Sequence, residues 1–340
     1  MKFIGMDAHS RTCTFVVLGK SGRVLRRATV KSQEDQLLEF VRSVRGQKKL
    51  AFEEGMMSQW LYLLFKDEVE EVVVCQPREK KGPKTDEIDA GELADLLRVG
   101  RLKSVFHSDS LLMELRVLTS GYDDVIQELT RIKNRYKALY HQVAIPTNVT
   151  GFYESKDMLS LLDTHERHYV ACTLVEQIGL FEEQRLGYVE RFESNVRKYK
   201  PIRLLTSIPG IGSIRANQIV ALMVTPYRFP KKYNLFSYAM LTKHNRISDG
   251  KLYGKRKAMG QSALKNVFKS AALSAIKSNC AFRRKYDEMR ENGKDDRTAR
   301  NAVAKSIAAT VMGVWKSGKK YNDQYKEVTR RRNQNCHSGT

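Results

Sequence analysis

Four residues separate the first two short apolar runs of the chain, which cover residues 2–7 and 12–18 and are rich in β-branched side chains. So short a connection predicts antiparallel strands, because a parallel pair needs a crossover of about a dozen residues or more. Gly19-Lys20-Ser21-Gly22 then separates the second run from a third, at 23–30. The N-terminus is therefore predicted to form a three-stranded antiparallel meander.

After this meander the pattern alternates between helix and strand. It predicts helices at 34–44, 58–65 and about 86–99, and strands at 49–53 and 71–75. Three strands followed by alternating helices and strands is the order of a ribonuclease-H-like α/β domain. A flavodoxin-type doubly wound sheet is the alternative, but it would need a helix between its first two strands.

The middle of the chain carries a coiled-coil-like seam with a strict 3,4 alternation. Its apolar positions are Leu115, Leu118, Tyr122, Val125, Leu129, Ile132, Tyr136 and Leu139. A second amphipathic stretch contains Leu174, Ile178, Phe181, Tyr188 and Phe192. These two stretches predict an antiparallel helical arm between two domains. The arm either joins copies of the chain into a dimer or tetramer or is an ordinary intramolecular helix pair.

From residue 201 onward the chain is predicted to be mostly helical, with a loop-like, basic segment at 242–260 and further helices at 262–316. Ile208-Pro209-Gly210-Ile211-Gly212 is similar to a helix-hairpin-helix motif, and we expect Gly210 and Gly212 to let a phosphate approach the backbone. A plain glycine-rich helix connection is the alternative. The predicted division is an α/β domain at 1–108, a helical arm at 109–200, a mostly helical domain at 201–320, and a basic, disordered tail at 321–340.

Charge indicates the class of partner. The chain has 60 Lys and Arg against 38 Asp and Glu, a formal net charge of +22, and its basic residues recur from Arg23 to Arg332. This distribution favours a nucleic-acid partner over a merely soluble basic protein. The five scattered cysteines predict neither a disulfide framework nor a zinc site. With no signal peptide and no membrane-spanning run, a cytoplasmic protein is expected.

Acidic residues are the first candidate catalytic group. Asp7 closes the first strand, and Glu53 and Glu54 close the fourth. Asp86 and Asp89 lie three apart at a helix start, so they share one face of it. In a ribonuclease-H-like sheet the first and fourth strands are neighbours, so these carboxylates converge and predict a Mg²⁺ or Mn²⁺ site. Singly, the two helix aspartates are explained as N-terminal helix charges and the glutamates as a solvated strand end.

The second candidate is a serine. Ser248 lies in Arg246-Ile247-Ser248-Asp249-Gly250, with Lys251, Lys255, Arg256 and Lys257 close behind it. Such a serine can act as a phosphoryl nucleophile if a base or metal removes its proton and the cations stabilise the developing charge. An ordinary loop hydroxyl is the alternative.

These motifs resemble the DEDD transposases of a group of bacterial insertion sequences, whose recombinases are guided by an element-encoded bridge RNA. The similarity lies in Gly5-Met6-Asp7, in the glutamate before Gly55, in Lys84-Thr85-Asp86-Glu87-Ile88-Asp89-Ala90, and in Ile208-Pro209-Gly210-Ile211-Gly212. Within this resemblance Ser248 matches the nucleophile. The chain departs from the family pattern at Glu53-Glu54-Gly55, which is one residue shorter than usual, so either glutamate can be the ligand; the register favours Glu53.

The resemblance implies a RuvC-like domain that holds Mg²⁺ or Mn²⁺ through Asp7, Glu53, Asp86 and Asp89. It implies a transposase that cleaves and rejoins DNA through these acids and Ser248, with the two centres contributed by different subunits. It also implies a structured guide RNA as partner. Nucleic-acid contacts are expected at Lys84, Gly210, Gly212, Lys251, Lys255, Arg256 and Lys257. Two alternatives remain: a metal-dependent junction resolvase without a serine intermediate, and a non-catalytic nucleic-acid scaffold.

Overall fold

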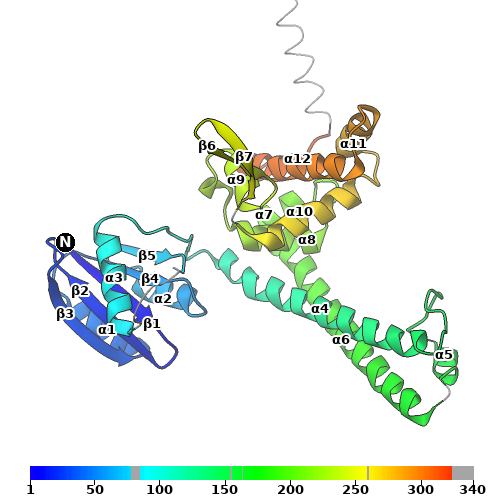
Figure 1. Cartoon of the computed structure of the whole chain (residues 1–340), viewed down its shortest axis with the longest axis horizontal. Helices are drawn as coiled ribbons and strands as arrows, with labels where there is room; N and C mark the ends of the chain where they lie inside the picture. The colour runs from blue at the N-terminus through cyan, green and yellow to red at the C-terminus, as the bar shows by residue number, and fades with distance from the viewer. Residues whose placement is uncertain (78–84, 154, 163, 259, 324–340) are drawn as a thin grey trace, which may run out of the picture. The chain divides into compact units, whose positions relative to one another are not determined.

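The computed structural model describes residues 1–77, 85–153, 155–162, 164–258 and 260–323, and of Lys156, Lys255 and Lys257 the backbone alone. The chain forms two compact units, Met1–Ser110 and Leu111–Thr340. Figure 1 traces both along the chain from blue to red. The finer division into arm, helical domain and tail stays a prediction.

A five-stranded mixed sheet forms the centre of the first unit, in the order β3-β2-β1-β4-β5. Strands β1 (Lys2–Ala8), β2 (Thr12–Leu18) and β3 (Val24–Lys31) are antiparallel, as the short connections between them require. Strands β4 (Lys48–Glu53) and β5 (Glu71–Cys75) continue the sheet in parallel with β1. The predicted neighbourhood of the first and fourth strands is confirmed, and this mixed α/β unit is consistent with a ribonuclease-H-like domain.

Helices cover both faces of this sheet. Helices α1 (Glu34–Ser43) and α2 (Ser58–Phe65) pack on the face that carries Ile4, Met6, Leu50 and Phe52, where the main apolar core of the unit lies. Helix α3 (Asp86–Arg98) packs on the opposite face, through Ala90 and Ala94. Alternation along β1 therefore directs Gly5 and Asp7 toward the face that α3 covers.

Two long helices, α4 (Leu115–His141) and α6 (His165–Lys198), lie side by side in the second unit, with the short α5 (Lys156–Ser160) between them in the sequence. Six of the eight predicted seam residues are buried and the other two, Leu118 and Leu139, are half-buried. Since α6 of the same chain covers the seam, its burial is intramolecular. Self-association through the arm stays a prediction.

The remaining helices of this unit enclose a second apolar core, which contains Ile219, Phe268 and Ile307. They are α7 (Lys200–Leu205), α8 (Ser213–Met223), α9 (Lys232–Tyr238), α10 (Ser262–Ala275), α11 (Ala281–Glu291) and α12 (Asp296–Ser317), with short 3₁₀ turns η1 (Leu111–Met113) and η2 (Pro226–Arg228). The largely helical C-terminal region is as predicted.

The predicted loop at 242–260 is wrong in one respect. Strands β6 (Lys243–Ser248) and β7 (Lys251–Lys257) form an antiparallel hairpin there, which projects from the helices of its unit (Figure 1). Asp249 and Gly250 form its two-residue turn, with φ of 49° and 70°. Positive φ at both turn residues is the type I′ geometry that matches the twist of a hairpin.

Of the helices in the described part of the chain, none combines the length and apolarity that crossing a bilayer requires. The described cysteines Cys13, Cys75, Cys172 and Cys280 form no disulfide bonds.

Candidate metal centre and serine hairpin

Asp7 lies near the end of β1, where its backbone pairs with Thr14 of β2. The apolar residues before it are drawn into the core, which fixes the strand and holds Asp7 at the edge of the sheet. Its side chain is 18% exposed. The carboxylate is therefore held in place but accessible.

Helix α3 begins beside the end of β1, and two local features fix its position. The Thr85 side chain caps the helix by accepting a hydrogen bond from the Ile88 N–H at 3.3 Å. Gly5 lets the helix approach the strand, because a Cβ on Gly5 would lie 1.9 Å from the carbonyl oxygen of Ala90. The first helical residue, Asp86, is thereby brought next to Asp7.

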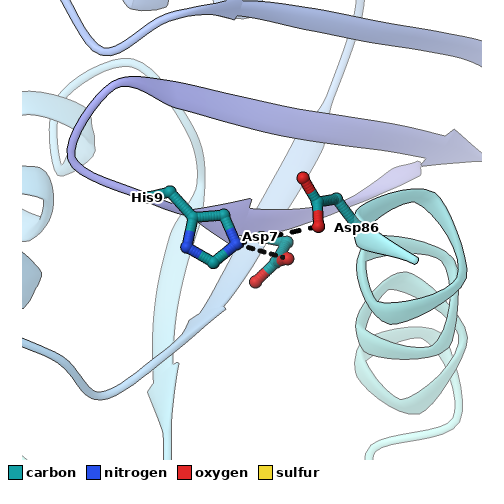
Figure 2. A group of neighbouring side chains, drawn as sticks. All are labelled: Asp7, His9 and Asp86. Atoms are coloured by element: carbon teal, nitrogen blue, oxygen red, sulfur yellow. Dashed lines mark hydrogen bonds and ion pairs between the residues drawn. The ribbon is translucent and has the colours of Figure 1, made fainter. Parts of the chain in front are cut away.

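Asp7, Asp86 and His9 form a compact group in which one ligand atom from each lies within 4.8 Å of the other two. Figure 2 shows the His9 ring beside both carboxylates, with its Nε2 atom 3.2 Å from Asp7 Oδ2 and 3.8 Å from Asp86 Oδ1. The sequence interpretation did not include His9. No sequence signal marked it, because His9 lies just after the end of β1 and an exposed histidine there has no characteristic spacing.

Glu53 ends β4, one residue beyond the Met6–Phe52 pair that aligns β1 with β4. The same register places it beside Asp7, and it lies on the same face of the sheet as Ala51, the neighbour of Gly5. Within the described residues the tight group nevertheless consists of Asp7, His9 and Asp86, with Glu53 and Asp89 outside it. Asp89 is 8% exposed and lies one helical turn after Asp86.

Glu54 has a different environment. Its Oε2 atom lies 2.7 Å from Nε2 of His107, whose side chain is 3% exposed. The other ring nitrogen lies 2.9 Å from Oε1 of Gln59, and the Gln59 amide donates to the Ser108 carbonyl at 2.8 Å, which fixes the orientation of that amide. Glu54 is thus engaged in a partly buried network with the connecting segment, and this arrangement favours Glu53 as the acid next to Asp7.

The donor set fits a hard divalent cation. Two carboxylates from separate elements repel each other, and a cation between their oxygens removes that repulsion. The imidazole nitrogen within the same distance is a ligand typical of transition-metal ions, whereas the two carboxylates suit Mg²⁺ and Mn²⁺. Cys13 lies nearby, but burial raises the pKa of its thiol and so disfavours the thiolate form that binds metals.

Ser248 is exposed at the last position of β6 and pairs with Lys251 across the type I′ turn. His244, at the base of the hairpin, lies 2.8 Å from the Ser237 hydroxyl through its Nε2 atom, which ties the hairpin to α9. Arg256 is exposed on β7, while Lys255 and Lys257 are known only by their backbone positions. Ser248 belongs to the second unit and the acids to the first.

The two glycines of the predicted helix-hairpin-helix differ in the space around them. Gly210 has φ of 84°, and a Cβ there would lie 2.3 Å from the carbonyl oxygen of Ala271 on α10, so close packing explains its missing side chain. Gly212 precedes α8, has open space around it, and lines a cavity of about 750 Å³ together with Arg215. Phosphate contact at either glycine stays a prediction, and Lys84 lies outside the described residues.

Comparisons with known proteins match both units. Residues 4–145 match a family described as a DEDD transposase of IS110 type, and residues 202–287 match the transposase family of IS116, IS110 and IS902. The chain is also similar to the insertion element IS110 uncharacterized 43.6 kDa protein of Streptomyces coelicolor, with 22% identity over 294 residues that cover 71% of this chain and 73% of that protein.

Proposed function

The chain belongs to the IS110-type family of DEDD transposases, and from this premise we propose that it cuts and rejoins DNA strands with a metal-binding acid centre and a serine nucleophile. Transposases of this family are DNA strand-transfer enzymes, and their nuclease domains use divalent metal ions. What we propose beyond this is the role of each residue, the identity of the metal and the involvement of a guide RNA.

The observation that carries the proposal is the convergence of Asp7 and Asp86. They come from a strand and a helix separated by most of the first unit, yet their oxygens and the His9 nitrogen lie within 4.8 Å of one another. Asp7, Glu53, Asp86 and Asp89 would hold Mg²⁺ or Mn²⁺. A bound divalent ion supplies Lewis-acid stabilisation of phosphate oxygens and aligns the attacking and leaving oxygens.

Ser248 would perform the covalent step. Its Oγ atom forms a bond to phosphorus while the bond from phosphorus to one sugar oxygen breaks; the serine proton is lost, and the sugar oxygen leaves as a hydroxyl after taking up a proton. A sugar hydroxyl of the partner strand then attacks the phosphoserine, which rejoins the DNA and returns Ser248 to its hydroxyl form. Lys251, its cross-strand partner, would stabilise the negative charge of the phosphorane.

Among the side chains that the structure describes, none forms a hydrogen bond with Ser248 that would identify it as the base. We therefore propose that the acid centre and Ser248 act on the same phosphodiester, with the two contributed by different subunits of a dimer or tetramer. Exchange between copies is compatible with the division of the chain into two separate units.

A structured guide RNA is proposed as the second nucleic acid. The formal net charge of +22 suits extended contact with phosphate backbones, and base pairing by RNA would supply sequence choice while the protein contacts backbone. Sequencing the RNA that copurifies from cells carrying the reading frame with its native flanking DNA tests this. A transcript of the flanking DNA is expected, and bulk cellular RNA without enrichment would contradict it.

The acid centre is tested with a plasmid that carries the reading frame and its native flanking DNA in a bacterial host. Asp7→Asn is expected to abolish recombination, because it removes a charged ligand, and to lower the affinity of the purified protein for Mn²⁺ at least tenfold in calorimetry. Asp67→Asn is the matched control, since Asp67 lies in the same unit with a side chain 82% exposed. Recombination by Asp7→Asn at the wild-type level would contradict the proposal.

A further inference from the structure

Three apolar side chains at the tip of the β6–β7 hairpin are exposed. Ile247 is 65% exposed, Leu252 58% and Tyr253 72%. A hairpin of two strands is marginally stable alone in water, and β6 and β7 pack chiefly against each other. An apolar tip on such a hairpin indicates a surface that is covered in a complex.

The register places this surface one residue pair from Ser248 along the hairpin, on the opposite face. Ile247 pairs with Leu252, one step from the Ser248–Lys251 pair that closes the turn. Successive pairs point to opposite faces, so the apolar pair lies on the face opposite Ser248. Tyr253 lies between the Ile247–Leu252 and Arg246–Gly254 pairs and is the additional residue of a β-bulge, a feature that redirects a side chain.

Charge around the tip favours a nucleic acid as the occupant. Lys243, Arg246, Lys251 and Arg256 are exposed on the two strands, and Asp249 is the one acid of the hairpin sequence. A second copy of the chain would bring the same cations against these. A polyanion with flat apolar faces matches both features, since phosphates meet the cations and a base meets the ring.

We propose that the hairpin tip is a base-stacking site, in which Tyr253, together with Ile247 and Leu252, stacks on an unpaired DNA base while a neighbouring phosphodiester of the same strand reaches Ser248 on the other face of the hairpin. The choice of DNA rests on the proposed function, because Ser248 on the same tip would join DNA. Unpaired bases are the preferred partners because stacking on them requires no disruption of a duplex. The hairpin thereby selects distorted DNA at the cleavage position.

The test measures binding without strand chemistry, in EDTA. The probes are a 30-base-pair DNA duplex with a two-nucleotide bulge that contains 2-aminopurine, the same duplex fully paired, and an RNA version of the bulged duplex. Tyr253→Ala is expected to lower affinity for the bulged DNA about tenfold, or about 1.4 kcal/mol, and to lose the quenching of 2-aminopurine that stacking causes. Affinity for the paired duplex is expected to stay the same.

Matched variants separate stacking from folding. Tyr253→Phe keeps the ring and is expected to bind as wild type. Tyr253→Leu keeps an apolar strand residue without a ring and is expected to lose the preference for bulged over paired DNA. Tyr233→Ala removes a tyrosine that is 65% exposed on α9 and is expected to change nothing. Ser248→Ala is expected to bind the bulged DNA as wild type does. The binding test therefore examines the stacking site separately from the covalent chemistry of Ser248.

Three results would overturn the stacking site. Unchanged bulge affinity and quenching in Tyr253→Ala would show that the ring contacts no base. Stronger binding and quenching with the RNA bulge than with the DNA bulge would make the occupant RNA. A fall in oligomer mass on Tyr253→Ala in light scattering without nucleic acid would make it a second copy of the chain.

Discussion

Gly5 leaves no room for a side chain, and the position of the acid centre depends on this. The space that a Cβ would fill belongs to the backbone of Ala90 and Ala94, so α3 lies directly on β1. Because Asp86 and Asp89 are carried by α3, any shift of that helix moves both acids away from Asp7.

Replacing Gly5 by alanine is expected to lower the free energy of unfolding by about 2–3 kcal/mol and to weaken Mn²⁺ binding, since backbone cannot yield as a flexible side chain does. Thermal unfolding followed by circular dichroism, with calorimetry for the metal, measures both. Gly187→Ala is the control: it lies in α6 with open space around it, so a gain of about 0.5–1 kcal/mol is expected. Equal stability of Gly5→Ala and wild type would contradict the packing argument.

Glu53 and Glu54 are expected to differ in function. Glu53→Gln is predicted to reduce recombination by more than tenfold because it removes a proposed metal ligand, whereas Glu54→Gln is predicted to act chiefly on stability through the contact with His107. Recombination assays and unfolding curves of both variants make the comparison. The reverse order of effects would indicate that Glu54 is the metal ligand and that the strand register does not identify it.

The place of some of these residues in the site could be predicted from the sequence, and that of others could not. Asp7 and Asp86 were predictable because each stands where a strand ends or a helix begins, and topology brings such positions together. His9 and His107 were not, because an exposed histidine after a strand and a buried histidine in a connecting segment have no characteristic spacing. The partners of His107, Glu54 and Gln59, are about 50 residues earlier in the chain.

Helix α4 combines an apolar seam with a partly buried acid, Asp123. Asp123 lies beside the seam, lines the cavity between α4, α8 and α10, and accepts a hydrogen bond at 2.8 Å from the Gln218 amide. Burial raises the pKa of its carboxyl group, with a smaller contribution from Asp124. Since the folded protein holds this proton more tightly than the unfolded chain, the contribution of Asp123 to stability is present at low pH and lost as pH rises through the raised pKa.

Asp123→Asn is therefore expected to raise Tm at pH 7, by about 2 °C for a chain of this size. The asparagine carbonyl can still accept the Gln218 hydrogen bond and carries no charge to desolvate. At pH 3, where the carboxyl group is protonated in both states, the two proteins are expected to unfold at the same temperature. Calorimetric scans at the two pH values test this, and a variant less stable than wild type at pH 7 would contradict it.

The elements of the first unit were predictable because strand and helix periods differ and the connections are short. The β6–β7 hairpin was not predicted, since its abundant lysine and arginine were interpreted as a loop. Asp249-Gly250 was the missed signal, because this dipeptide favours a type I′ turn. The seam predicted two packed helices, but the 3,4 pattern is the same whether the partner helix comes from the same chain or another, so the sequence alone left that alternative open.

The proposed chemistry is divided between the two units of the chain. Met1–Ser110 carries the acids, and the unit that begins at Leu111 carries Ser248 on its hairpin. Strand transfer through a covalent intermediate needs both, whereas a metal-dependent nuclease needs the first alone. The two mechanisms differ in one product, a DNA strand bonded to protein.

That bond is the decisive observable. The protein is expressed from the plasmid with its native flanking DNA, denatured, treated with nuclease to leave a nucleotide remnant, digested, and examined by tandem mass spectrometry. The remnant is expected on Ser248, to be absent in Ser248→Ala, and to be absent in Asp7→Asn because the acid centre is needed for the same step. A remnant on Tyr253, or recombination by Ser248→Ala at the wild-type rate without any adduct, would contradict the serine mechanism and favour a metal-only nuclease.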